Sequence, residues 1–186
     1  MPNWCNNTIT ITGPKHKIEL LWKNATQDTD AETGLMNGMI PMPDALRETT
    51  SPDPQPGQSN YEGPQPVVDG FTNWYDWRVA KWGIKWDVSS EGLEYSEDGD
   101  TATITGWFDS PWGPPIEGIA AYTQANEDVY IECFYHEPGM AFVGCWDSDG
   151  GDDHYSYESA NDIPDYLDEH FGISEQLEMW AEDELA

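Results

Sequence analysis

Strand-like and helix-like segments follow one another along this chain in an order that few small folds share. Residues 8–12 alternate threonine with isoleucine and end before a Gly-Pro pair, which is the period-two pattern of a half-buried strand. Ile18, Leu21 and Trp22 then share one face of a predicted helix over residues 15–25. The same patterns predict further helices at 71–82, 115–126, 162–171 and 174–184, and further strands at 84–88, 101–109, 129–136, 140–146 and 154–157.

This order predicts an α+β protein with a ferredoxin-like split βαβ antiparallel sheet, extended by an extra β-hairpin and C-terminal acidic helices. Residues 26–70 contain seven prolines among Gly, Ser and Gln residues, which is typical of a long irregular insertion. A length of 186 residues suits one domain. We therefore expect a single domain over residues 1–186, with 26–70 as a Pro-rich insertion and 147–186 as an acidic C-terminal extension.

Charge is distributed very unevenly along the chain. Residues 1–85 contain 10 acidic and 7 basic residues, whereas residues 86–186 contain 26 acidic residues and neither Lys nor Arg, for a net charge of −29. Such a surface repels nucleic acid and anionic membranes and attracts basic partners. Aromatic residues make up 13% of the chain, which argues for a folded core and against a disordered acidic tail.

The three cysteines, Cys5, Cys133 and Cys145, are too few for a disulfide scaffold. The first residues lack the basic and apolar regions of a signal peptide, and no apolar run approaches the roughly 20 residues that span a bilayer. We therefore expect a reduced, soluble protein in the cytoplasm of the host cell.

Four aromatic-rich motifs occur in a fixed order along the chain. They are Met1-Pro2-Asn3-Trp4-Cys5-x-Asn7, Trp74-Tyr75-x-Trp77-x5-Gly83-x-Lys85-Trp86, Phe108-Asp109-x-Pro111-Trp112-x-Pro114 and Tyr135-x-Glu137-x-Gly139-x-x-Phe142-x-Gly144. Together they resemble the YubB-like proteins of plasmids and phages, whose C-terminal part is a ferredoxin-like domain. The resemblance implies an accessory protein of a mobile element and carries over no activity. It does not extend to the acidic segment after residue 147.

An acidic loop near the C-terminal end invites a calcium interpretation. Counted from Asp147, carboxylates fall at loop positions 1, 3, 7 and 12, but Asp152 occupies position 6, where an EF-hand needs glycine. The flanking segments also look like strands. The alternative is a Gly-Gly hairpin whose carboxylates are solvated.

Other metal and catalytic chemistry has weak support. Cys5, Cys133, His136 and Cys145 could supply four zinc ligands, but there is no close Cys-x2-Cys pair, and residues 133 and 136 of one strand point to opposite faces. Each cysteine lies in an aromatic strand, where a buried, inert thiol is the commoner case. No phosphate-binding loop or hydrolase motif is present. We therefore predict no catalytic residues, no metal site and no cofactor, and we do not expect an enzyme.

The tryptophans could form a base-stacking platform, as in ferredoxin-like RNA-binding domains. Those domains combine aromatic with basic residues, and this chain lacks both that pattern and the charge that neutralises phosphates. We therefore expect Trp74, Trp77, Trp82, Trp86, Trp107 and Trp112 to pack in the core.

Acidic residues recur at helical spacing near the C-terminal end. Glu175, Glu178 and Glu182 share one helix face, opposite Leu177 and Trp180. Like charges at this spacing each cost about 0.2–0.5 kcal/mol, a cost that lysine at one position would remove. Carboxylate rows on folded elements can imitate the phosphates of duplex DNA. The candidate partner-binding residues are Asp147, Asp149, Asp152, Asp153, Asp162, Asp165, Asp168, Glu169, Glu175, Glu178, Glu182 and Asp183.

These observations lead to one hypothesis and three alternatives. The hypothesis is a non-enzymatic phage or plasmid accessory protein that binds a basic host protein through its acidic face, as a DNA mimic against a defence or DNA-binding protein. The alternatives are a salt-adapted structural domain without a target, a calcium-binding module and an enzyme of unknown type. The asymmetry of the charge argues against salt adaptation, since an environmental bias should thin Lys and Arg throughout the chain.

Overall fold

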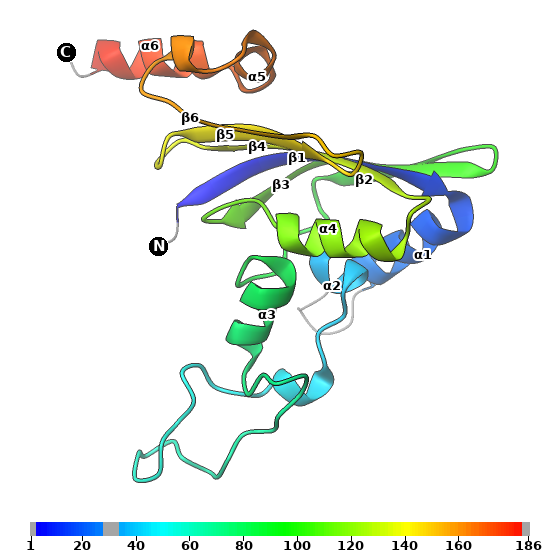
Figure 1. Cartoon of the computed structure of the whole chain (residues 1–186), viewed down its shortest axis with the longest axis vertical. Coiled ribbons are helices and arrows are strands. Elements are labelled where there is room, and N and C mark those ends of the chain that lie inside the picture. Colours follow the sequence, from blue (N-terminus) through cyan, green and yellow to red (C-terminus); the bar gives the residue numbers. More distant parts are fainter. Residues whose placement is uncertain (1–2, 28–33, 184–186) are drawn as a thin grey trace.

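A six-stranded sheet forms the centre of the protein. The computed structural model describes residues 3–27 and 34–183, with side chains up to Ala181. The strand order is β2-β3-β1-β4-β5-β6, and each strand is antiparallel to its neighbours (Figure 1). The strands are β1 (Trp4–Pro14), β2 (Leu93–Asp98), β3 (Thr101–Pro111), β4 (Tyr130–Glu137), β5 (Phe142–Asp147) and β6 (Asp152–Ser156). The order β2-β3-β1-β4 confirms the predicted ferredoxin-like sheet, and β5 and β6 form the predicted hairpin extension.

Helices lie on both sides of this sheet. The helices are α1 (Lys15–Thr26), α2 (Leu35–Met39), α3 (Trp74–Trp82), α4 (Ile116–Ala125), α5 (Asp165–Phe171) and α6 (Ile173–Asp183), with short 3-10 helices η1 (Asp44–Leu46) and η2 (Ala160–Asp162). Helices α1 to α4 lie on one side, and α5 and α6 lie on the opposite side (Figure 1). In the part of the chain that the structure describes, no helix is long and apolar enough to span a membrane.

The main core lies between the sheet and helices α1 to α4. Alternation along β1 turns Cys5, Ile9 and Ile11 toward these helices, where all three are buried. Ile18 and Leu21 of α1 are also buried, on the face that the sequence predicts. The largest fully buried side chain is Trp82, at the end of α3.

A second, smaller core lies on the other side of the sheet. Val143 of β5 contributes to it from the sheet, and Leu167 of α5 and Ile173 of α6 contribute from the terminal helices. Tyr157 and Ile163, from the segment between β6 and α5, complete it. The acidic terminal helices therefore form a packed layer of the protein.

The predicted strand at 84–88 is wrong, because this segment is irregular and the strand β2 begins only at Leu93. Gly83 ends α3 in the left-handed conformation, with a φ of 82°, which turns the chain away. Asp87 then accepts hydrogen bonds from the backbone N–H groups of Met36 (2.8 Å) and Asn37 (2.9 Å), at the start of α2. The chain therefore uses this segment to hold α2.

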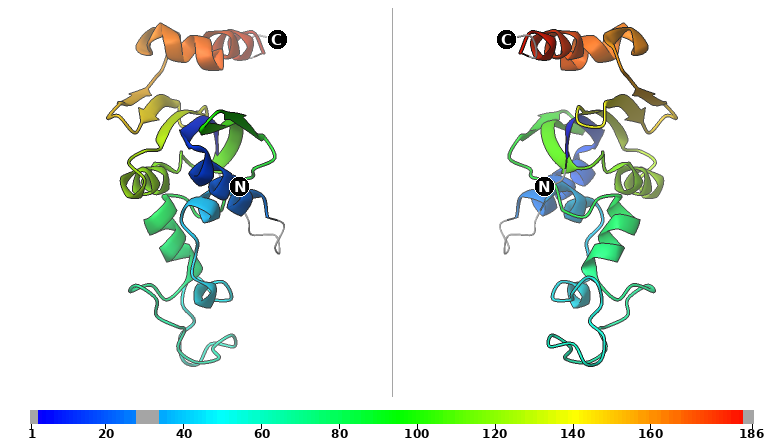
Figure 2. Two further views of the ribbon diagram at one scale, coloured as in Figure 1. Left: turned by 90° about the vertical axis from the view of Figure 1, so that its right-hand side faces the viewer. Right: turned by 90° about the vertical axis from the view of Figure 1, so that its left-hand side faces the viewer.

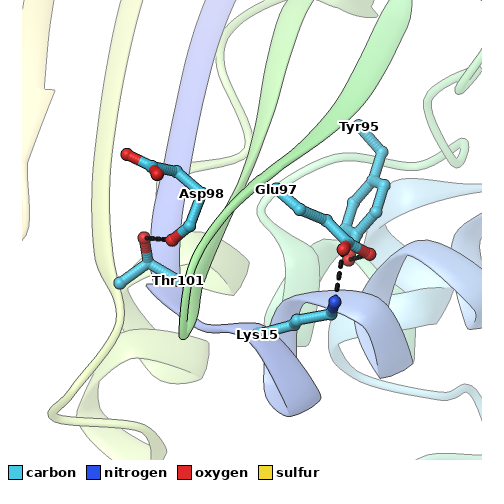
Figure 3. A network of polar contacts seen from close by, with 5 residues as sticks. All are labelled: Lys15, Tyr95, Glu97, Asp98 and Thr101. Atoms are coloured by element: carbon cyan, nitrogen blue, oxygen red, sulfur yellow. Dashed lines mark hydrogen bonds and ion pairs between the residues drawn. The ribbon is translucent and has the colours of Figure 1, made fainter.

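Strand β2 forms over residues 93–98, where the sequence patterns predict no strand. Leu93 and Tyr95 face the main core, and Tyr95 stacks on Trp22 of α1 at 6.0 Å between ring centres. Glu97 binds Lys15 and accepts a hydrogen bond of 2.8 Å from the Tyr95 hydroxyl group (Figure 3). An edge strand needs few apolar residues, and β2 is rich in acidic residues. The apolar periodicity of the sequence therefore does not predict it.

The proline-rich insertion divides into two parts, and residues 28–33 lie outside the described residues. Leu35, Met36 and Leu46 are fully buried in the main core, contrary to the expectation of an irregular loop throughout. Residues 51–66 instead project away from the sheet, at the end of the molecule opposite to α5 and α6 (Figure 2).

Candidate functional site

The predicted acidic residues lie on the hairpin of β5 and β6 and on the layer formed by α5 and α6. Eight of them are exposed, and Asp162 is one of these; the other seven are Asp149, Asp152, Asp153, Asp165, Glu169, Glu175 and Glu178. We call these seven residues the acidic face. The side chains of Glu182 and Asp183 lie outside the described residues.

Three further predicted acids hold local structure. Asp147 accepts hydrogen bonds from the backbone N–H groups of Asp149 (2.8 Å) and Gly151 (3.1 Å), which closes the turn between β5 and β6. Asp162 accepts from the N–H groups of Glu158 (3.0 Å) and Ser159 (2.8 Å), and these bonds lower the pKa of its carboxyl group. These two carboxylates are therefore already engaged with the backbone.

Asp168 joins the two terminal helices. Its carboxylate accepts hydrogen bonds from the hydroxyl group of Ser174 and from the Ser174 backbone N–H group (2.6 Å), and the bond from the hydroxyl is the main reason that the Asp168 pKa is lowered. The predicted helix at 162–171 begins only at Asp165, because Pro164 precedes the first turn and Asp162 caps the previous one. The acidic spacing is therefore helical only from Asp165 onward.

Helix α6 buries one side and leaves apolar residues exposed beside its acids. Ile173 is buried and Leu177 packs against the second core. Met179 and Trp180 expose 58% and 47% of their surface. The acidic face is therefore bordered by an exposed tryptophan, the type of residue that often anchors protein interfaces.

The loop that the calcium interpretation concerns is the turn of a β-hairpin. The loop from Asp147 to Asp152 joins β5 to β6, with Gly150 at a φ of 108°. The Asp147 carboxylate points to the loop's own N–H groups. Among the described residues, no group of three or more His, Cys, Asp or Glu residues is arranged to hold a metal ion.

The four zinc candidates point to opposite faces of the sheet. Cys5 and Cys133 are fully buried on the side of helices α1 to α4. His136 contacts Phe171 at 5.3 Å between ring centres on the other side, and Cys145 packs against the second core there. Burial raises the pKa of Cys5 to about 12, and that of Cys145 to about 12, so these thiols are protonated at neutral pH.

The prediction that the tryptophans fill the core is only half correct. Trp77 and Trp82 are buried, and Trp74 packs against the main core. Trp86, Trp107 and Trp112 are exposed by 40%, 61% and 64%. Local sequence does not distinguish the two groups, because the exposure of each ring depends on which distant residues pack against it.

The motifs of the YubB-like resemblance converge at one end of the sheet. The backbone N–H group of Trp112 donates to the carbonyl oxygen of Asn3 (2.9 Å), and the rings of Trp4 and Trp86 lie 6.1 Å apart. Lys85 lies over Trp86, with its Nζ atom 4.1 Å from the ring centre, and it also lies 5.4 Å from the ring centre of Trp112. Three motifs distant in sequence therefore build one aromatic cluster.

Asn7 anchors this cluster from inside the protein. Its Nδ2 atom donates to the carbonyl oxygens of Cys5 (2.8 Å) and Phe108 (3.2 Å), and to the Oγ atom of Ser110 (2.8 Å). Glu137 of the fourth motif is also buried, and its carboxylate accepts hydrogen bonds from the backbone N–H groups of Gly139 and Met140. The motif residues thus have a structural role, which the sequence alone does not reveal.

Comparison with known proteins identifies the family. Residues 81–175, about half of the chain, match the model of a family described as the ferredoxin-like domain in Api92-like protein. No curated protein matches the chain. Among solved structures, the protein Api92 from Yersinia pseudotuberculosis is similar at 14% identity, over 86% of this chain and 99% of that chain, with a TM-score of 0.46. On the sequence match, the chain belongs to the family of proteins that carry the ferredoxin-like domain of Api92-like proteins.

Proposed function

We propose that this protein is a non-enzymatic accessory protein of a phage or plasmid that binds a basic host protein through its acidic face. The observation that carries the proposal is the placement of the acidic residues on folded elements. Asp165 and Glu169 project from α5, and Glu175 and Glu178 from α6, while Leu167 and Ile173 fix these helices to the second core. The charge is thus displayed on a fixed surface.

Electrostatics favours a basic partner for this surface. The chain contains no Lys or Arg after residue 85, and thus the sequence places no cation within the acidic helices to neutralise their charge. Single-sign surfaces steer oppositely charged partners at rates that fall steeply with salt. A host protein that binds DNA has a basic surface that recognises phosphates. We therefore propose that the acidic face imitates the phosphates of DNA and acts as a DNA mimic.

The motifs support the mobile-element part of the proposal. They resemble YubB-like proteins of plasmids and phages, and three of them meet in the aromatic cluster around Lys85. An accessory protein that inhibits a host defence or DNA-binding protein needs no catalytic residues of its own.

Charge reversal at matched positions tests the proposal. The test variant carries Asp165→Lys, Glu169→Lys, Glu175→Lys and Glu178→Lys. The control variant carries Glu19→Lys, Glu48→Lys, Glu62→Lys and Glu127→Lys, which also lie at exposed positions and change the net charge equally. Each variant is used to capture proteins from host lysate at low and high salt, and the affinity of the captured protein is then measured.

We expect the control variant to retain a basic host protein that the test variant loses, and we expect high salt to release it. Equal capture by both variants, or capture that salt does not change, contradicts the proposal. Strong stabilisation of the protein by molar salt, without any basic partner, would instead support the salt-adapted domain.

A further inference from the structure

Part of one sheet face remains uncovered beside helix α5. Helices α5 and α6 cover the β4 to β6 part of that face (Figure 1), and β1 and β3 carry threonines on the remainder. A groove of about 320 Å³ lies between helix α5 and strand β3. It is lined by Thr8, Ile9, Thr10, Thr105, Gly106, Trp107, Glu132, Phe134 and His170. We call this the sheet groove.

The strand register arranges the groove in two rows. Thr8 of β1 pairs with Trp107 of β3 and with Phe134 of β4, so that an aromatic ring stands on each side of one threonine. The ring of His170 stacks on Phe134 at 4.2 Å and builds up that wall. Since neighbouring strands lie roughly 4.8 Å apart, the two aromatic walls rise from positions roughly 10 Å apart.

The second row ends in carboxylates. Thr10 pairs with Thr105 of β3 and with Glu132 of β4, and Thr105 pairs in turn with Glu94 of the edge strand β2. The side chains of paired residues point to the same face of the sheet. Two threonine hydroxyls are therefore flanked by two carboxylates, of which Glu94 is exposed.

The backbone places Trp107 as an open platform. A Cβ atom at Gly92 would lie 2.9 Å from Cε2 of the Trp107 ring, and so the ring can rest on this position only because it is glycine. The exposed fraction of Trp107 is 61% even so. One face of the indole thus packs on the chain, and much of the ring remains free for a ligand.

The chemistry of the groove selects a planar cation. A guanidinium group stacks on tryptophan within about 6 Å of the ring centre and pairs with carboxylate oxygens through its forked N–H groups. The protein uses the same cation–ring stacking elsewhere, because the guanidinium group of Arg78 lies over the Trp82 ring, 5.0 Å from its centre. The lining of the sheet groove contains no Lys or Arg residue.

We infer that the sheet groove binds an arginine side chain of the basic partner, stacked on Trp107 and paired with Glu132. This inference rests on the proposed function, since it names the residue type that the partner inserts beside the acidic face. Charge complementarity supports this occupant: the groove offers carboxylates, hydroxyls and aromatic rings, and a net charge of −29 repels anionic ligands.

The probe for the test is Nα-acetyl-L-arginine methylamide, with the matching lysine compound for comparison. Its binding to the full chain is followed by ¹H–¹⁵N NMR, in which the indole N–H signals report each tryptophan. We expect saturable shifts at Trp107 and around the groove, and weaker binding of the lysine compound because an ammonium group cannot stack or fork. Shifts spread over all acidic segments without saturation would overturn the inference.

Two pairs of variants locate the site. W107A and E132Q should each weaken binding of the arginine probe about tenfold. W180A and E169Q change an exposed tryptophan and an exposed carboxylate of the terminal helices and should leave it unchanged. E132Q removes only a charge, so it keeps the test decisive if W107A fails to fold. Equal affinity of E132Q and the unchanged protein for the probe would overturn the inference.

The host partner separates this inference from the proposed function. If the partner requires the acids of α5 and α6 but binds W107A and E132Q normally, the groove inference fails and the proposed function stands. If the arginine probe saturates the groove with the expected variant pattern but no basic partner depends on those acids, the guanidinium site stands and the proposed function fails.

Discussion

The Nε2 atom of His170 lies 2.7 Å from the Oγ1 atom of Thr8, which joins helix α5 to the central strand β1. The same imidazole ring stacks on Phe134, and burial lowers its pKa, which favours the neutral form at pH 7. The acidic layer is therefore attached to the ferredoxin-like sheet by a hydrogen bond and a ring contact as well as by the second core.

Removal of this attachment should weaken the protein modestly. H170A loses the hydrogen bond to Thr8 and the ring contacts with Phe134 and Phe171, and we expect the free energy of unfolding to fall by about 1–2 kcal/mol. Urea denaturation measures the change. His16 of α1 is exposed, and so H16A is the matched control and should change stability little. Equal losses in the two variants would show that His170 does not attach α5.

One buried histidine and one half-buried aspartate should change the stability of this protein with pH in opposite directions. Burial lowers the pKa of His136 from 6.5, so the unfolded chain binds its proton more readily. Its stabilising contribution is therefore present above pH 6.5 and is lost as the pH falls through the folded pKa. Burial raises the pKa of Asp87 from 3.8 to about 6, and so this group stabilises the fold as the pH falls through 6.

A histidine variant separates the two effects. H136Q should lose less stability between pH 7.5 and pH 5.5 than the unchanged protein, because the destabilising group is gone while Asp87 remains. Urea unfolding at the two pH values measures this difference, with H16Q as control. An identical pH dependence in H136Q and the unchanged protein would contradict the prediction.

Adjacent asparagines on β1 provide a second matched pair. Asn7 is buried with three hydrogen bonds, whereas Asn6 is exposed and donates to Asp109 at 2.7 Å. We expect N7A to cost about 2–3 kcal/mol, because buried carbonyl and hydroxyl groups lose their partner, and N6A to cost less than about 0.5 kcal/mol. Thermal and urea unfolding of both variants compare them directly. Similar costs at the two positions would refute the anchoring role of Asn7.

Leu167 should decide whether the acidic layer stays in place. Its side chain is fully buried in the second core, and L167A should cost about 2–5 kcal/mol through the cavity it leaves. Because this core is separate from the main one, we expect amide hydrogen exchange to accelerate first in α5 and α6. Leu20 of α1 is 58% exposed, and L20A serves as the control. Uniform acceleration over the whole sheet would contradict a separate second core.

Much of the ferredoxin-like architecture follows from short-range patterns. The alternation over residues 8–12 and the helical spacing of Ile18, Leu21 and Trp22 reappear in β1 and α1. These periods are local properties of the backbone, and so they predict elements without knowledge of neighbours. The uneven charge is likewise visible in the sequence, as is the β5–β6 hairpin.

Tertiary structure alone decided the features that depend on distant partners. The segment 84–88 alternates like a strand, yet Asp87 caps α2 instead, while acidic β2 is a strand because β3 pairs with it. The sequence pattern does not distinguish Trp82 from Trp107, but Trp82 is buried and Trp107 is exposed on the sheet face that it shares with Thr8. The sequence by itself determined the elements and the charge of this protein, because both are local. The fold decided which acids are free and which rings are exposed, because burial and hydrogen bonding depend on residues far away in the chain.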